Sequence, residues 1–356
     1  MFNDKTLLSE STILHDTQNI DIVAVLLDKG CRVDIRNAAG KTVLFTPEQN
    51  GSDHFWNFQP ERTRMLLRAG VDVDARDSRG RTAVFSAVLA LQVSQKLDDT
   101  AVQNIQQYYT GKWPQILVSD WLQSLGNGIH RRNHVEALET LQVLIDAGLD
   151  LNLKDKDGRT ALHLLLGVED LSWFTRRPSH GAFKATKMLL KADANASITD
   201  DEGHTPLHRA ARTADCPIIA ALLDAGVNVN AVALSGRTPL FEAVCRRGPQ
   251  LGPAGYFAAK LLLERGADIN AHDENGRTAL HEAAATKPKP KEARQKTLDP
   301  GEFDTVVLLL DWGADPTVRG VDGDTALDVA LRAHKSALAE VLEDATNTVW
   351  CPRYVS

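Results

Sequence analysis

The sequence predicts an all-α fold, a solenoid in which pairs of helices stack and short hairpin loops join one pair to the next. Three observations predict it: a short motif recurs along the chain, each copy is followed by an apolar segment that mostly ends at glycine, and additional residues always enter at the same place. The motif, Gly-x-Thr-x-Leu, begins at Gly40, Gly80 (with valine in the last position), Gly158, Gly203, Gly236, Gly276 and Gly323, and an eighth copy without the glycine occupies residues 12–15. One such unit cannot bury its own apolar face, so stability must come from stacking.

The first helix of each copy is expected to begin at the motif threonine. In the copy at residues 200–232, Gly203 suits a turn that would strain other residues, and Thr205 is a natural N-cap. Pro206 fits the first helical position. Leu207 and Ala210 then begin a narrow apolar stripe, which predicts close packing against neighbouring helices.

The second helix of the same copy is expected to end at Gly226, after the apolar pair Leu222 and Leu223. Glycine at this position supplies the left-handed conformation that commonly terminates a helix. The fourth copy has Asp193 there, and aspartate tolerates this conformation better than most other residues.

These features resemble the ankyrin repeat. The resemblance rests on Thr205-Pro206-Leu207-His208, on the closing run Gly266-Ala267-Asp268-Ile269-Asn270, and on the 33 residues that separate Thr205 from Thr238. It implies one ankyrin-repeat solenoid over residues 1–343, with short β-hairpin loops, helix–helix insertions and a C-terminal tail at 344–356. The expected units are 6–36, 37–76, 77–154, 155–199, 200–232, 233–272, 273–319 and 320–343. The family implies a scaffold that binds other proteins without catalysis.

The insertions are the feature that departs from a plain repeat. The spacing of the motif threonines exceeds 33 residues by 7, 45, 12, 7 and 14 in the second, third, fourth, sixth and seventh copies. Each surplus falls between the first and second helix, and the largest insertion is expected at residues 91–134. Insertions at a constant position collect along one edge of a solenoid, which is often a binding edge.

Aromatic and arginine side chains are concentrated in these insertions. Two interpretations stay open. In one, the rings pack each insertion against its own repeat; in the other, they line a shared groove with arginines at its rim. The insertion residues predicted to bind are Phe55, Trp56, Tyr109, Trp113, Trp121, Trp173, Phe174, Arg176, Arg177, Arg246, Arg247 and Tyr256.

The resemblance also places residues on the inner groove of the solenoid. The position after each signature histidine faces that groove in the family, and here it holds Arg209, Glu242 and Glu282, with Arg212 one turn further on. Mixed charge of this kind is typical of a solvated or peptide-binding surface. We therefore add Arg209 and Arg212 to the predicted binding residues.

A small-molecule binder or enzyme is the alternative hypothesis. A pocket walled by the insertions would bind an apolar metabolite and carry out metal-independent cyclase or isomerase chemistry by acid–base catalysis. Its candidate catalytic residues are His54, His180, Glu242 and Glu282. No cofactor is expected and no spacing indicates a metal site, because the histidines of the repeat motif, such as His208, are expected to bond locally and order the repeat.

Composition narrows the partners. The net charge of −7 and pI of about 5.9 argue against a dominant role in binding nucleic acid or anionic membranes. The four cysteines are far apart, which is typical of reduced thiols inside a cell. We therefore expect a cytoplasmic protein with a protein or peptide partner. The basic segment at residues 287–291 makes the nucleus the alternative location.

Overall fold

Helices account for nearly all the regular structure in the computed structural model of this chain. The structure describes residues 13–17, 19–45, 59–93, 129–167, 180–245, 254–285 and 300–347. Within these ranges there is no extended strand, and one isolated bridge pairs His272 with Thr278. The predicted all-α repeat architecture is confirmed.

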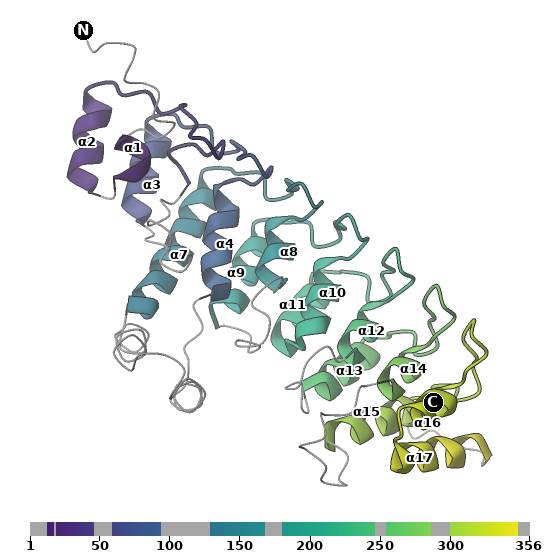
Figure 1. The fold of residues 1–356 in the computed structure, drawn as a ribbon. Helices are drawn as coiled ribbons and strands as arrows, with labels where there is room; N and C mark the ends of the chain where they lie inside the picture. Colours follow the sequence, from purple (N-terminus) through teal and green to yellow (C-terminus); the bar gives the residue numbers. More distant parts are fainter. Residues whose placement is uncertain are drawn as a thin grey trace, which may run out of the picture. The chain divides into compact units, whose positions relative to one another are not determined.

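The helices fall into two compact units (Figure 1). Unit 1 comprises residues 1–165 and 179–194, and unit 2 comprises residues 166–178 and 195–356. Unit 1 holds α1 (Ile13–Asp16), α2 (Ile20–Asp28), α3 (Pro60–Arg68), α4 (Ala83–Val93), α7 (Ile129–Asp146), α8 (Ala161–Leu166, apart from its last residue) and α9 (His180–Lys191). Unit 2 holds α10 (Pro206–Thr213), α11 (Cys216–Asp224), α12 (Pro239–Val244), α13 (Ala254–Glu264), α14 (Ala279–Ala284), α15 (Pro300–Asp311), α16 (Ala326–Arg332) and α17 (Ser336–Asn347).

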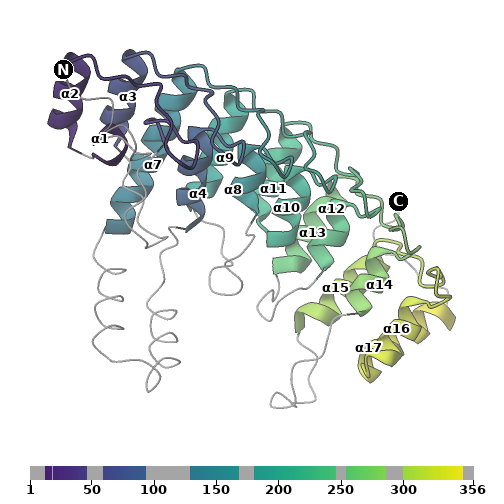
Figure 2. The same cartoon turned by 45° about the horizontal axis from the view of Figure 1, so that its top comes forward.

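Packing within unit 2 follows the repeat. The first helices of successive copies contact one another, α10 with α12, α12 with α14 and α14 with α16, and each also contacts the second helix of its own copy (Figure 2). Leu207, Ala210 and Leu222 are fully buried in these contacts. The alanine at the interface keeps the helices close, because it adds almost no bulk between them.

The helix ends confirm the expected capping. Thr205 precedes α10 in an extended conformation, and Pro206 lies in the first turn of the helix. His208 completes a capping box with Thr205. Gly226 ends α11 with φ of 84°, and Asp193 has φ of 62° at the equivalent place. The stop signals read from the sequence therefore act as predicted.

The hairpins between copies are closed turns linked by backbone hydrogen bonds. In unit 2 the N–H of Leu234 donates to the carbonyl of Glu202 at 3.0 Å, and the N–H of Glu274 donates to the carbonyl of Ser235 at 3.1 Å. Gly236 is required by this approach, because its φ is 77° and a Cβ there would lie 2.7 Å from the Glu274 nitrogen.

In the third, fourth, sixth and seventh copies the intervals 94–128, 168–179, 246–253 and 286–299 separate the first helix from the second, as expected. In the second copy residues 41–45 are non-helical, so no first helix is described ahead of the interval 46–58. The last helix, α17, runs to Asn347, beyond the residue 343 at which we expected the solenoid to end. The count of eight repeats and their predicted bounds stay predictions.

Candidate functional site

Most of the predicted insertion site lies outside the described residues. This holds for Phe55, Trp56, Tyr109, Trp113, Trp121, Trp173, Phe174, Arg176, Arg177, Arg246, Arg247 and the catalytic candidate His54. His180 is the first residue of α9, but its side chain is also outside the description. The predicted convergence of the insertions on one edge therefore stays a prediction.

Tyr256 is the predicted insertion residue that the structure does describe. It lies on α13, half-buried, with its ring edge-on to that of Phe257 at a centroid distance of 5.4 Å. Phe257 is 54% exposed, so this aromatic pair is partly open to solvent.

Three of the predicted groove residues of unit 2, Arg212, Glu242 and Glu282, belong to a charged network centred on Arg237. Its guanidinium lies 4.0 Å from a Glu242 carboxylate oxygen, 3.3 Å from Glu282 and 3.8 Å from Asp273. Arg212 approaches Glu242 from α10 at 4.0 Å. We call Arg212, Arg237, Glu242, Asp273 and Glu282 the Arg237 cluster. It brings together two of the catalytic candidates, Glu242 and Glu282, and one of the binding candidates, Arg212.

Burial and charge act in opposite directions on the hub of this cluster. Desolvation alone lowers the pKa of Arg237, but the negative charges around it, Glu282 first, outweigh that effect and raise its pKa. The arginine therefore stays charged, and the neighbouring carboxylates have a permanent cation between them. Only Arg212 is substantially open, with 41% of its side chain exposed against 8% for Glu242.

Local sequence explains how the hub is positioned. Arg237 stands between the turn residue Gly236 and the N-cap residue Thr238, so its backbone is fixed on both sides. Asp273 uses Oδ1 to accept the backbone N–H groups of Asn275 and Arg277, which leaves Oδ2 to face Arg237. The hairpin thus orients a buried carboxylate toward the guanidinium.

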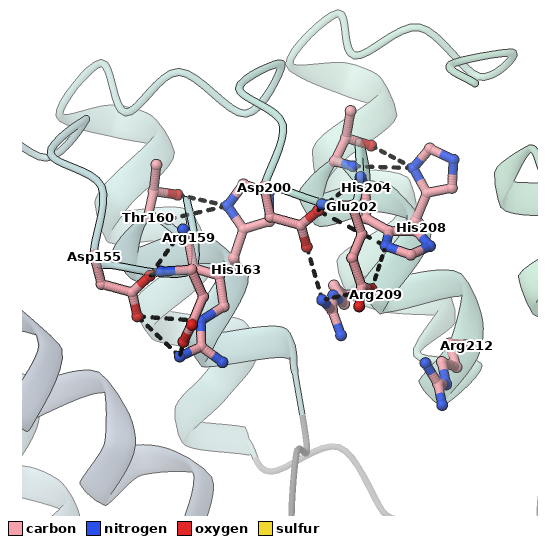
Figure 3. Close-up of polar contacts among 12 residues, drawn as sticks. Asp155, Arg159, Thr160, His163, Asp200, Glu202, His204, His208, Arg209 and Arg212 are labelled. Atoms are coloured by element: carbon pink, nitrogen blue, oxygen red, sulfur yellow. Dashed lines mark hydrogen bonds and ion pairs between the residues drawn. The ribbon is translucent and has the colours of Figure 1, made fainter. Parts of the chain in front are cut away.

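Arg209, another predicted groove residue, has a different partner. Its guanidinium donates to Asp200 Oδ2 at 2.7 Å (Figure 3). Burial opposes ionisation of Asp200, but the hydrogen bonds from Arg209 and from the His204 backbone outweigh it, and the pKa of Asp200 is lowered. Arg209 is therefore tied to its own hairpin, while Arg212 one turn later is directed elsewhere (Figure 3).

Unit 1 has a corresponding cluster with the signs reversed. Asp155, whose side chain is 1% exposed, is bound by Arg159 at 3.0 Å and faces Arg81 at 3.6 Å (Figure 3 shows the first pair). Arg159 also pairs with Asp157. We call Asp155, Arg81 and Arg159 the Asp155 cluster, and it lies entirely within hairpin residues.

The signature histidines have the structural role that was expected. His208 Nδ1 accepts the backbone N–H of Thr205 at 3.0 Å, and its Nε2 lies 3.1 Å from the carbonyl oxygen of Arg237 in the next copy. His281 makes the same two contacts, with Thr278 and Asp324. Burial lowers the pKa of His208 to about 4, so this ring is neutral near pH 7.

Sequence reasoning missed the hubs of both clusters. Arg237, Asp273, Asp155 and Asp200 were not among the predicted site residues. A signal for three of the hairpins was present: Asp-x-x-Gly-Arg-Thr recurs at residues 77–82, 155–160 and 273–278. The aspartate and arginine of this motif place one carboxylate and one guanidinium in each hairpin. An arginine of one hairpin can then face the aspartate of the next, as Arg81 faces Asp155.

Comparison with known proteins matches part of the chain to ankyrin-repeat families. Residues 177–251 match a family described as ankyrin repeats (3 copies), residues 255–289 match ankyrin repeats (many copies), and residues 275–321 match the ankyrin repeat. Ankyrin repeats therefore lie within residues 177–321 of this chain.

Several relatives carry related segments. The chain is 33% identical over 185 residues to the nuclear factor NF-kappa-B p105 subunit of Gallus gallus, with 52% of this chain and 16% of the relative covered. It is 28% identical over 232 residues to a putative palmitoyltransferase ZDHHC13 of Danio rerio, covering 58% of this chain and 32% of the relative. It is 28% identical over 187 residues to inversin of Homo sapiens, with 50% of this chain and 15% of the relative covered. The chain spans about a third or less of these relatives, so their similarity concerns the repeats.

Two further observations bear on the kind of site. No described helix combines the length and the apolar character needed to span a bilayer. Within the described ranges, no three His, Cys, Asp or Glu side chains are grouped in a way that would hold a metal ion.

Proposed function

We propose that this chain is a protein-recognition module that holds a protein or peptide partner along the first helices of its repeats. Ankyrin repeats typically mediate protein–protein interaction, and relatives such as the NF-kappa-B p105 subunit and inversin fit that role. The observation that carries the proposal is the Arg237 cluster, which extends charge across α10, α12 and α14 in unit 2.

The cluster is suited to recognition because its members differ in exposure. Glu242 and Asp273 are nearly buried and Arg237 is fixed between them, whereas Arg212 extends into solvent beside Glu242. An arginine held next to a buried carboxylate loses less side-chain freedom on binding than an unrestrained one. Its planar guanidinium retains donors for a carboxylate or carbonyl of a partner.

The insertions complete the proposed surface. Their aromatic and arginine content, including Trp173 and Arg176, is the composition that interface centres favour. The cytoplasmic location, with the nucleus as alternative, also remains a prediction. The small-molecule or enzymatic hypothesis stays a prediction as well, and no contact among the described residues favours it.

The test compares two single charge reversals of equal size in the full chain. A photo-crosslinking residue at position 213 would capture the bound partner from cells, and quantitative mass spectrometry would measure the yield of each crosslinked protein. We expect Arg212→Glu to lower the yield of a defined partner at least tenfold. Lys260→Glu on α13, which reverses a cation already paired with Glu264, should leave it within twofold.

Equal yields for both variants would refute the first-helix surface as the site of recognition. A loss in both variants would point to general charge effects and would refute it as well.

A further inference from the structure

The three hairpins of unit 1 present a row of exposed cations. We call this the basic hairpin row, and it consists of Arg36, Arg76, Arg79, Lys154 and Lys156. The hairpins that carry it are joined in sequence: the Ser78 N–H donates to the Ala39 carbonyl at 2.8 Å, and the Lys156 N–H donates to the Arg79 carbonyl at 3.0 Å. The five cations therefore lie on one continuous edge of unit 1.

Two of these side chains are fixed by backbone contacts to the next hairpin. Arg36 Nη1 donates to the Gly40 carbonyl at 2.8 Å and also to the carbonyl of Arg76. Arg76 Nη2 donates to the carbonyl of Lys154 at 3.0 Å. Carbonyl acceptors do not neutralise the charge, and a guanidinium has five N–H donors, so each arginine keeps donors for a ligand. Both are already ordered, which reduces the entropic cost of binding.

The carboxylates of the same hairpins are occupied by other partners. Asp77 accepts the backbone N–H groups of Arg79 and Arg81, and Asp155 is buried in the cluster that bears its name. Asp157 pairs with Arg159. Of the described residues, no carboxylate lies at ion-pair distance from Arg36, Arg76, Arg79 or Lys156. No ion pair among the described residues therefore neutralises these four cations.

We propose that the basic hairpin row binds an extended acidic segment of a partner protein. Neighbouring packed helices lie about 8–10 Å apart, and the hairpins follow that spacing. An extended peptide advances about 3.3 Å per residue, so acidic side chains at roughly every third position would meet successive hairpins. This surface lies on unit 1 and is separate from the Arg237 cluster, so the inference goes beyond the function proposed above.

Charge distribution favours an acidic protein segment over nucleic acid. The chain has a net charge of −7, which repels a long polyanion more than it repels a short segment. The hairpins that follow along the chain expose four acids, at Asp201, Glu202, Glu274 and Asp322, beside one exposed arginine, Arg319. A nucleic acid site would need the basic row to continue, because affinity depends on the number of phosphates neutralised.

The experiment measures fluorescence anisotropy of a labelled 12-residue peptide, four repeats of Glu-Gly-Ser, with the full chain at low salt. The test variant is Arg79→Gln with Lys156→Gln, because neither side chain bonds to the described hairpins and the fold should be retained. We expect at least tenfold weaker binding. The matched control, Lys29→Gln with Arg68→Gln, removes two exposed cations at helix ends of unit 1 and should stay within twofold.

Three results would overturn the proposal. One is undetectable binding to the unmodified chain, or an equal loss in the test and control variants. The second is tighter binding of a single-stranded 12-nucleotide DNA than of the peptide, which would assign the row to nucleic acid. The third is equal affinity for a peptide with its four glutamates in one block, which would show that the spacing of the hairpins does not determine binding. Because Arg212 is not in the row, each of these results leaves the first-helix proposal standing.

Discussion

The two charged clusters use the hairpins of the repeat in opposite ways. In unit 1 a buried carboxylate, Asp155, is the hub and two arginines surround it. In unit 2 an arginine, Arg237, is the hub and three carboxylates surround it. The first cluster is confined to hairpins, whereas the second extends to Glu242 on α12 and Glu282 on α14. The comparison shows two uses of a charged hub in a repeat. The hub either links residues of the hairpins alone, as in unit 1, or connects a hairpin to charged residues of the first helices, as in unit 2.

The largest expected effect comes from neutralising the hub of unit 1. Asp155→Asn keeps an oxygen for the backbone N–H groups of Asp157 and Arg159 but leaves the two guanidinium groups without their shared anion. Breaking a buried pair from one side costs about 3–5 kcal/mol. Chemical unfolding, with hydrogen exchange of residues 154–166 to localise the loss, would measure it. A change below about 1 kcal/mol would show that the cluster is dispensable to the fold.

Stability measured over a range of pH tests the surroundings of the unit 2 hub, because His208 contacts the carbonyl of Arg237. The folded pKa of His208, about 4, is below its ordinary value of 6.5, so its stabilising contribution is full above 6.5 and is lost as the pH falls toward 4. Burial raises the pKa of Asp215 to about 6, against the opposing hydrogen bond from the Ile218 N–H. The contribution of Asp215 is full below 3.8 and is lost as the pH rises toward 6, so the two effects oppose each other.

Single variants should separate these two effects. Relative to the unmodified chain, the free energy of unfolding of His208→Gln should rise by about 2–3 kcal/mol as the pH falls from 6.5 to 4, and that of Asp215→Asn should fall by a similar amount. Urea unfolding at several pH values would measure both. Curves that stay parallel to that of the unmodified protein would contradict the assignment of these buried groups.

Removing the hub of unit 2 should cost less than removing that of unit 1. Arg237→Met leaves Glu242, Asp273 and Glu282 without their shared cation, but the arginine side chain is 20% exposed and water compensates in part. We expect a loss of about 1–2 kcal/mol in chemical unfolding. Arg265→Met removes the exposed pair with Asp224 and is the control, with an expected change under about 0.5 kcal/mol. Equal losses of unfolding free energy in the two variants would show that Arg237 contributes no more to stability than an exposed ion pair does.

The smallest stability effect is expected at Arg212. Its side chain is 41% exposed and lies 4.0 Å from Glu242, so Arg212→Gln should change the free energy of unfolding by less than about 0.5 kcal/mol. Partner binding should weaken nonetheless, if the first-helix surface is the site of recognition. Thermal unfolding and the crosslinking yield would report the two quantities separately. A large loss of stability would make Arg212 a structural residue.

The sequence predicted the fold well because each repeat carries residues that mark where its helices begin and end. Thr205, Pro206 and Gly226 each perform a backbone task that few residues can perform, so their pattern alone placed the helices. The charged hubs were harder to predict, because Arg237 meets Glu282 across 45 residues and only stacking brings them together. The partner of Arg209 was equally hard to predict, because its bond to Asp200 of the same hairpin depends on distances that a sequence does not contain.

The position of the insertions has a consequence for how such a chain can change over time. Bonds between successive copies run through the hairpins, as from Leu234 to Glu202, and through the packed helices. The extra residues of the third, fourth, sixth and seventh copies enter between the two helices of one copy and outside these hairpins. A change of length at these positions therefore leaves the hairpin bonds between successive copies in place.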